Sequence, residues 1–219
     1  MPVSPTKKPT ARAQQAAETR ERIIAAAVQI FSETTYDEVA VSDIAKAAGV
    51  AHGLLFHYFG SKRGIYLEAM RGAAEQLDAA FVFNPDLSPV EQLRHAMASH
   101  LSYLAAHPGL AQRLILGGRG ADPTAWEVFE AARWRAVEAT AELFGVDASR
   151  PAVRMAGRAA VSALDEAAIF WLHNDQPFGI DEIVDWMVAM TAAIMRESTR
   201  LDPRVGIDEA LAGIDDRLT

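Results

Sequence analysis

Apolar residues recur every three or four positions through most of the chain, and this spacing gives an α-helix one apolar face. In the first such segment Ile24, Val28 and Phe31 share a face, while Glu21 and Gln29 lie opposite. This helix is expected from residue 19 to about residue 34, where the sequence TTYDE interrupts the pattern. No segment alternates apolar and polar residues as a half-buried strand does. The pattern therefore predicts an all-α protein.

A glycine separates the next two helical patterns. Val41, Ile44 and Ala48 define a short helix that stops at Gly49, and another begins just after it and reaches about Tyr58. Glycine inside a helix costs roughly 1 kcal/mol relative to alanine. One residue beyond a helix, however, it takes the left-handed conformation that ends the helix and turns the chain. Two short helices around such a turn form a helix-turn-helix.

Longer helical patterns follow, separated by segments rich in proline and glycine. Proline lies near the start of several of them, where its missing N–H does least harm. The expected helices span residues 62 to about 81, 89–106, 110 to about 116, 122–144, 151–173 and 180 to about 198. Residues 1–15 show no periodicity and are rich in Pro, Thr, Lys and Gln, which favours a mobile tail.

The net charge of −8 conceals an asymmetry between the two parts of the chain. Residues 1–71 carry 9 Lys and Arg against 7 Asp and Glu, whereas residues 72–219 carry 12 against 22. All four lysines lie in the first part. Only that part can approach a polyanion such as DNA without general repulsion.

Residues 19–70 resemble the DNA-binding domain of the TetR family of bacterial transcriptional regulators. An I-A-x-x-A-G-V turn is followed by G-x-L-x-H-x-F and, three residues on, by a lysine. The resemblance implies a DNA-binding domain at 19–78, with its helix-turn-helix at about 43–62, after a mobile basic tail at 1–18. It also implies a larger helical effector-binding and dimerisation domain at 79–199, followed by an acidic tail at 200–219.

The resemblance also implies a set of DNA contacts. Residues 51–58 are expected in the major groove of a double-stranded operator, and the lysine at the start of the next helix is expected on a phosphate. The candidate DNA-binding residues are Ser42, His52, Gly53, Leu54, His57, Tyr58 and Lys62.

Several positions depart from the family pattern, which often has hydroxyl groups or lysine there. They are Ala40, Ala51, His52, Leu54 and Phe56. The missing donors predict fewer polar contacts to phosphate, with apolar contact to thymine methyl groups replacing part of the readout.

The large side chains of GVAHGLLFHYFGSK, residues 49–62, are not all expected to have the same role. Leu55 and Phe59 lie four residues apart and are expected in the core. Phe56 remains open between groove and core, and His57 has packing between helices as its alternative. A metal site is a poorer explanation, because His52 lies five residues from His57 and no nearby carboxylate completes a ligand set.

Apolar and aromatic residues at helical spacing in the second part fit a ligand pocket between helices. Each one alone is equally well explained as core. As a group they indicate, by analogy with the family, a pocket for an unidentified small apolar or amphipathic effector. The candidate pocket residues are Met97, Leu101, Leu104, Trp126, Phe129, Arg133, Phe170 and Trp171.

Two carboxylates interrupt an otherwise apolar helix at Asp165 and Glu166. A buried carboxylate needs a partner. Candidate partners are Arg119, Arg133, Arg135 and Arg158. The carboxylate forms either a structural ion pair or an orienting group at a ligand, and we favour the ion pair.

The last two predicted helices suit an interface between two copies of the chain. Small residues between 156 and 168 permit close approach of helices, and the final helix carries an apolar stripe. The candidate interface residues are Ala160, Leu164, Ile183, Trp186, Met187, Met190 and Ile194. A two-fold homodimer predicts a palindromic operator.

Other classes of protein find little support. The chain has no cysteine, no G-x-S-x-G, no H-E-x-x-H and no apolar run long enough to cross a membrane. We therefore expect no enzyme, metal, cofactor or membrane partner. The sequence predicts a cytoplasmic, homodimeric DNA-binding regulator, most simply a repressor relieved by ligand. The alternative is a helical interaction module of the same fold with weak or lost DNA binding.

Overall fold

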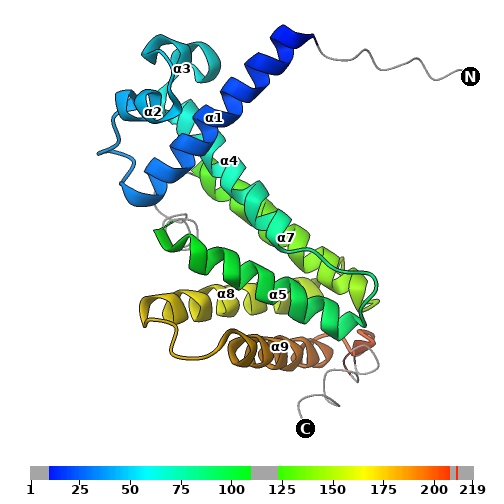
Figure 1. Ribbon diagram of the computed structural model, residues 1–219. Coiled ribbons are helices and arrows are strands. Elements are labelled where there is room, and N and C mark those ends of the chain that lie inside the picture. The colour runs from blue at the N-terminus through cyan, green and yellow to red at the C-terminus, as the bar shows by residue number, and fades with distance from the viewer. Residues whose placement is uncertain (1–9, 110–122, 208–210, 212–219) are drawn as a thin grey trace, which may run out of the picture. The chain divides into compact units, whose positions relative to one another are not determined.

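The computed structural model describes residues 10–109, 123–207 and 211 (Figure 1). All regular structure within these ranges is helical, as predicted. The chain divides into two compact units, Met1–Ala73 and Ala74–Thr219. The predicted short helix at 110–116, and Arg119, lie outside the described residues.

The first unit contains α1 (Ala11–Glu33), α2 (Val41–Ala48), α3 (His52–Phe59) and the first part of α4 (Lys62–Ala80). Helix α1 begins earlier than predicted, because residues 11–18 are helical rather than part of a tail. The hydroxyl of Thr10 accepts a hydrogen bond from the amide of Ala13 at 3.3 Å and so caps the helix.

The turn between α2 and α3 has the predicted geometry. Gly49 has φ 65° and ψ 39°, the left-handed conformation. The amide of the next residue, Val50, donates to the carbonyl oxygen of Ala45 at 3.0 Å, which closes the end of α2. Ile44 on α2 and Leu55 on α3 are both fully buried, so the two short helices share the core of this unit.

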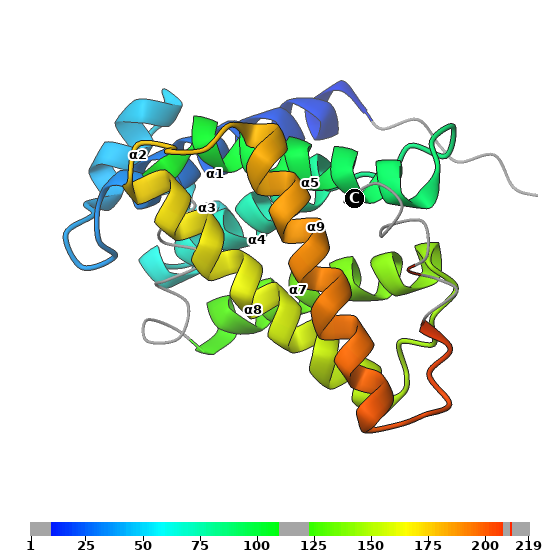
Figure 2. The same cartoon turned by 90° about the horizontal axis from the view of Figure 1, so that it is seen from below.

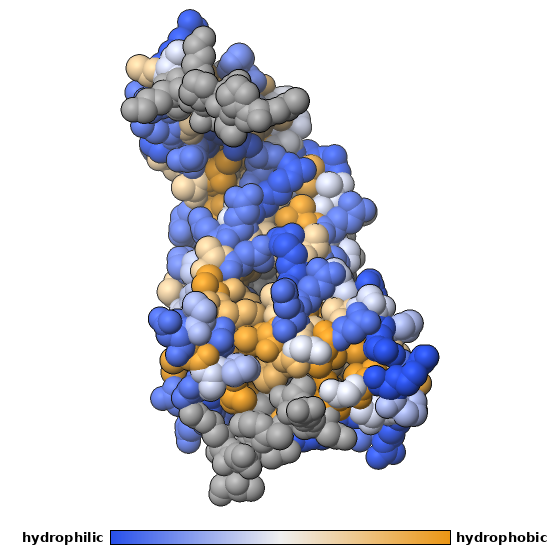
Figure 3. Space-filling model, turned by 90° about the vertical axis from the view of Figure 1, so that its right-hand side faces the viewer, coloured by the Kyte–Doolittle hydropathy of each residue, from blue (hydrophilic) through white to orange (hydrophobic). Residues whose placement is uncertain are grey.

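The second unit is a layered bundle of longer helices. Helices α8 and α9 lie side by side, and α9 also packs against α5 (Figures 1 and 2). The elements are α5 (Pro89–Ala106), α7 (Pro123–Leu143), α8 (Pro151–His173), α9 (Ile180–Glu197) and a short 3-10 helix (Ser198–Arg200). In Figure 3, which views this unit from the end where α5 begins and α7 ends, apolar residues emerge between hydrophilic ones.

Two helices of this unit, α5 and α9, begin with strong caps. Ser88 and Glu91 form a capping box at α5: the Ser88 hydroxyl accepts from the Glu91 amide, and a Glu91 carboxylate oxygen accepts from the Ser88 amide at 3.2 Å. At α9 the carboxylate of Glu182 accepts from the amide of Gly179 at 2.8 Å. These contacts satisfy backbone groups that helix starts otherwise leave without partners.

Within the predicted acidic tail, the described residues include three that belong to the core. Val205, Ile207 and Leu211 are buried in the hydrophobic core of the second unit. Apolar residues spaced two and four apart give no regular helical stripe, so periodicity did not reveal them.

Candidate nucleic-acid interface and ligand cavity

One face of α3 is exposed and carries three of the seven candidate DNA-binding residues. His52 and Phe56 lie four residues apart, as do Gly53 and His57, and all four are exposed. Leu55 points the other way and is buried. Phe56 is 42% exposed with its ring edge-on to that of His52, at 5.2 Å between centroids. The open question about Phe56 is thus answered, because it lies on the surface.

The other candidates of this set flank the exposed face. Leu54 and Tyr58 are half-buried, and Ser42 is exposed on α2. The ring of Tyr58 contacts that of His57, at 5.5 Å between centroids and 69° between planes. His57 is therefore not packed between helices in this unit.

Lys62, at the start of α4, has partners within its own unit. Its Nζ donates to the backbone oxygen of Asp37 at 3.2 Å and lies 4.8 Å from the centre of the Tyr36 ring. An ammonium group has three N–H donors, so this one hydrogen bond leaves capacity for a phosphate. The hydroxyl of Ser61 accepts from the amide of Gly64 at 3.0 Å. That capping serine was missed, although serine directly before a helix is the usual signal.

Helices α2 and α3 begin without side-chain caps. Ala40 and Ala51 occupy the N-cap positions, and neither can accept a hydrogen bond from the first turn. Alanine in place of serine or threonine at this position typically costs about 1 kcal/mol. These two helices are therefore held mainly by their buried apolar residues.

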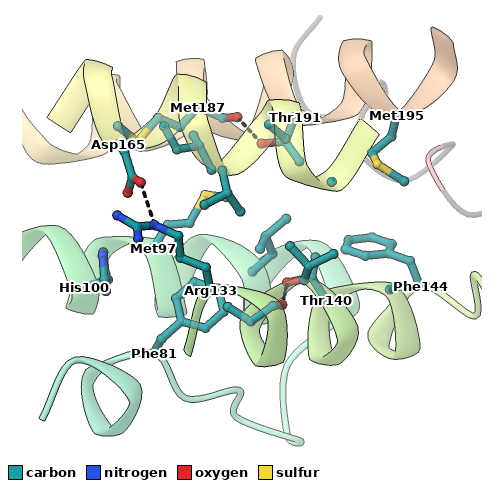
Figure 4. A pocket seen from close by; sticks show the side chains of 18 of the residues that line it. Phe81, Met97, His100, Arg133, Thr140, Phe144, Asp165, Met187, Thr191 and Met195 are labelled. Atoms are coloured by element: carbon teal, nitrogen blue, oxygen red, sulfur yellow. Dashed lines mark hydrogen bonds and ion pairs between the residues drawn. The ribbon is translucent and has the colours of Figure 1, made fainter. Parts of the chain in front are cut away.

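The second unit contains a cavity of about 200 Å³ (Figure 4). Its walls come from the last residues of α4, from α5, α7, α8 and α9, and from the segment after the 3-10 helix. Five of the candidate pocket residues line it: Met97, Leu101, Leu104, Phe129 and Arg133. The small residues Gly157 and Ala160 on α8 also line it, so their role goes beyond close helix approach.

The other three candidates lie away from this cavity, which corrects that part of the prediction. Trp126 is half-buried with the guanidinium of Arg133 5.2 Å from its ring centre. Phe170 is exposed, and Trp171 is buried in the core near the end of α8. Ala168 lines the cavity, and two residues further along a helix is a rotation of roughly 200°, which turns Phe170 to the opposite side.

One end of the cavity is polar and its charges are paired. Nε of Arg133 donates to a carboxylate oxygen of Asp165 at 2.8 Å, and Nη1 lies 3.4 Å from a carboxylate oxygen of Glu130. Arg158 also contacts Glu130. Burial raises the pKa of Asp165, while the charge of Arg133 opposes that rise. Glu166 is exposed, so of the two carboxylates only Asp165 faces the cavity.

His100 lies at the same end and was not among the sequence candidates. Its Nδ1 is buried without a hydrogen-bond partner among the described residues. Burial lowers the pKa of His100 to about 4, against smaller effects of opposite sign from Leu77 and Asp78. The imidazole is therefore neutral at pH 7.

The candidate interface residues divide between the core and the surface. Three of the seven are not available to a second copy, because Ala160, Ile183 and Met187 are buried. Leu164 is half-buried at the cavity, and Met190 and Ile194 are half-buried. Trp186, by contrast, is 55% exposed, and Met155 and Phe170 on α8 are 59% and 58% exposed. The apolar stripe predicted from the sequence combined residues of two faces of α9. One of these faces is turned inward and the other outward.

Within the described ranges, no group of three or more metal-ligating side chains gathers in one place. No helix in the part of the chain that the structure describes is long and apolar enough to span a membrane.

Comparison with known proteins agrees with this geometry. Residues 23–69 match the family described as bacterial regulatory proteins, tetR family. The chain is 25% identical over 178 residues to the transcriptional activator FasR of Mycolicibacterium smegmatis, covering 78% of this chain and 80% of FasR. It is 34% identical over 107 residues to the transcriptional repressor NicS of Pseudomonas putida, covering 47% of this chain and 50% of NicS.

A solved structure of a tetR-family transcriptional regulator from Streptomyces coelicolor superposes with a TM-score of 0.78 at 25% identity. The match covers 92% of this chain and 96% of that one. Residues 23–69 thus carry the DNA-binding domain of the TetR family, and over most of its length the chain is similar to transcription regulators of that family.

Proposed function

We propose that this protein is a homodimeric regulator that binds a palindromic operator and releases it when a small molecule fills the cavity of the second unit. The simplest outcome of such binding is repression, because occupancy of a promoter is enough to block it. The single observation that carries the proposal is the exposed face of α3, with His52, Gly53, Phe56 and His57 turned outward from a unit that matches the family.

Gly53 supports the proposal that a partner approaches this face closely. It lies inside α3, where glycine costs roughly 1 kcal/mol relative to alanine. A Cβ built on it meets nothing within 4 Å, so the fold itself does not require glycine. A nucleic-acid backbone or base edge lying against the helix would require it, since glycine permits close approach.

Exposed apolar side chains on α8 and α9 support the homodimer. Met155, Phe170 and Trp186 are large and more than half exposed, and the two helices that carry them lie side by side (Figure 2). Two helices from each copy then form a four-helix interface. Trp186→Glu is expected to give a monomer in sedimentation, whereas Glu142→Lys, on the exposed surface of α7, is expected to leave the dimer unchanged.

Helix α4 supports a link between ligand and DNA because it belongs to both units. It begins at Lys62, the unit boundary falls after Ala73, and Leu77 and Asp78 near its end line the cavity. A ligand that binds one position of this helix better than another shifts the population toward that position. The ligand cannot change the free energy of DNA binding by more than the difference between its own binding free energies for the two positions.

Selection of bound duplexes from a random pool tests the proposal, followed by titration of the enriched duplex at several salt concentrations. We expect a palindromic duplex to be enriched. The logarithm of its binding constant should fall linearly with the logarithm of the salt concentration, with a slope of about −0.9 for each phosphate neutralised. Lys62→Ala should weaken all sequences alike and reduce that slope by about 1, whereas His52→Ala should relax the preference at one base position. If Lys62→Ala relaxed the preference at one base position and His52→Ala weakened binding to all sequences alike, the assigned roles would be contradicted.

The alternative is an interaction module of the same fold, and the uncapped Ala40 and Ala51 are the observation that favours it. Hydroxyl groups at these positions would cap the start of each helix and could also hydrogen-bond a phosphate. If no duplex were enriched even at low salt, this alternative would replace the proposal.

A further inference from the structure

The cavity of the second unit lies along one face of α7 and one face of α8. Its lining residues on α7 recur at three- and four-residue spacing from Phe129 to Phe144. On α8 they recur in the same way from Val153 to Ala168. Each run advances 15 positions, from 129 to 144 and from 153 to 168, which is roughly 22 Å along a helix. The cavity is therefore elongated along these two helices.

The two helices run in opposite directions along this space. In the first half of α7, Glu130 contacts Arg158 of α8. One turn later, the ring centre of Trp134 lies 4.1 Å from the guanidinium carbon of Arg154. Residue numbers thus rise along α7 while they fall along α8. The two runs of lining residues therefore lie alongside each other and enclose one continuous space.

The two ends of this space differ in polarity. Arg133 on α7 and Asp165 on α8 meet at one end, while Phe144 and Met195 lie at the other (Figure 4). Nε of Arg133 donates to Asp165 at 2.8 Å, and Nη1 donates to Glu130 at 3.4 Å. A guanidinium group carries five N–H donors, so these two bonds leave donors for an oxygen atom of a ligand. A molecule with one polar end would therefore enter with that end toward Arg133.

The volume of the cavity determines how wide a molecule it can hold. At roughly 15 Å³ for each water-sized group, the cavity of about 200 Å³ accommodates about thirteen non-hydrogen atoms. With carbon–carbon bonds of about 1.5 Å at an angle of about 111°, an extended chain of that many carbons is about 15 Å long. Because the same volume is spread along most of two long helices, the atoms fit in single file. An unbranched chain matches this shape, whereas a compact ring system of equal size does not.

We propose that the cavity binds one unbranched alkyl chain of about twelve carbons, with an oxygen-bearing head group at Arg133 and its methyl end near Phe144 and Met195. This inference rests on the proposed function, because it gives the chemical class of the effector. The apolar wall provides affinity by removing methylene groups from water, and Arg133 sets the direction of the chain. An alcohol, an ester and a carboxylate share this chemistry, and matched probes distinguish them.

Probes that differ in length and in shape test the proposal on the intact chain. 1-Octanol, 1-decanol, 1-dodecanol and 1-tetradecanol differ only in length, and cyclododecanol closes the carbons of 1-dodecanol into a ring. In isothermal titration calorimetry the affinity should rise about fourfold for each added methylene and level off at about twelve carbons. 1-Dodecanol should bind roughly tenfold more tightly than cyclododecanol, because a misfitting shape strains a packed wall. Dodecanoate and methyl dodecanoate then show which head group Arg133 accepts.

A substitution near the apolar end locates the chain in the cavity. Ala141 lines the cavity one turn before Phe144, so Ala141→Leu places additional carbons where the end of the chain would lie. The affinity should then level off at about nine carbons, because the added side-chain atoms take the place of ligand atoms in a close-packed interior. Ala131→Leu, at an exposed position of the same helix, is the matched control and should leave the length dependence unchanged. Circular dichroism checks that both variants fold, and the comparison of probes on the wild type needs neither variant.

Three results would overturn the proposal: equal affinity for 1-dodecanol and cyclododecanol, an affinity that does not level off at about twelve carbons, or no binding by any of the probes. None of these depends on DNA. Enrichment of a duplex without a preference for unbranched chains would leave the DNA-binding proposal standing and reject the ligand class. Preference for these chains without an enriched duplex would support the ligand class and reject the DNA-binding proposal.

Discussion

The two units of this protein place their candidate functional side chains in opposite ways. In the first unit five of the seven DNA-binding candidates lie on one eight-residue helix, α3, within a few positions of one another. In the second unit the candidates that line the cavity face inward, and five helices build a cavity wall that runs from Leu77 to Leu211 in sequence. A surface site of the first kind depends on local sequence, whereas an interior site of the second kind depends on how distant segments pack.

The helices of the helix-turn-helix also differ from α5 in how they begin. The short helices α2 and α3 begin at alanines that cannot cap them, whereas α5 begins with the capping box of Ser88 and Glu91. We therefore expect the helix-turn-helix to open locally at lower cost than the bundle. All four tryptophans lie beyond residue 120, so tryptophan fluorescence reports on the second unit alone, while circular dichroism reports on both.

The largest expected effect comes from the core of the first unit. Leu55→Ala should lower its free energy of unfolding by about 3 kcal/mol, because it removes buried methyl groups and leaves a cavity. Denaturant unfolding should show the loss by circular dichroism and leave the tryptophan transition in place. The neighbouring Leu54→Ala is the control: half-buried, it should change stability by less than about 1 kcal/mol and act mainly on DNA affinity. An equal shift in both signals would show that the units unfold together.

The next effect is acid destabilisation of the second unit through His100. Its folded pKa is about 4, below the ordinary 6.5, so the unfolded chain binds more protons between these values. Stability should therefore fall as pH drops from about 6.5 to about 4, by about 2 to 3 kcal/mol from this residue. Asp165, whose pKa burial raises, titrates with the opposite sign. Comparison of variants isolates the histidine: His100→Phe should lose this pH dependence, and His95→Asn, at an exposed position of α5, should keep it.

A smaller effect is expected from the ion pair at the cavity. Asp165→Asn should lower the stability of the second unit by about 1 to 2 kcal/mol, because Arg133 loses its 2.8 Å partner in a partly buried setting. Thermal unfolding without ligand measures the loss. Glu166→Gln alters the exposed neighbour and should have no measurable effect. An unchanged melting temperature in Asp165→Asn, with altered ligand response, would assign Asp165 to the ligand instead.

The smallest effect has opposite signs in two assays. Gly53→Ala should stabilise the first unit by about 1 kcal/mol, because alanine favours a helix and its Cβ has open space. The same methyl group should weaken binding of the enriched duplex if DNA lies against α3. Circular dichroism and duplex titration on the same variant provide the two measurements. A variant that gained stability and kept full affinity would show that nothing approaches closely at this position.

Much of this fold could be predicted where local chemistry decides it. Prolines at residues 89 and 151 gave the starts of α5 and α8, and the glycine at residue 49 gave the turn. The first turns of α1 were missed, because residues 11–18 carry no apolar stripe; their helical signal is the high propensity of Ala, Gln, Arg and Glu. The exposed face of α3 followed from four-residue spacing once Leu55 was assigned to the core.

The cavity could be predicted only in part, because burial of a polar residue depends on tertiary packing. His100 stands between Ser99 and Leu101 in a helix with several polar positions, and no periodicity singles out its ring as buried. Ile207 and Leu211 occur in a segment whose composition resembles an acidic tail. Phe170 illustrates the converse, since an aromatic residue in an apolar helix turned out to lie on the surface.

The burial of Ile207 and Leu211 in the cavity wall bears on the order in which the protein is made. The ribosome synthesises α2 and α3 some 150 residues before it reaches these two side chains. A growing or prematurely terminated chain therefore carries α3 well before the cavity of the second unit is closed. Under the proposed function, such a product would bind DNA without responding to ligand.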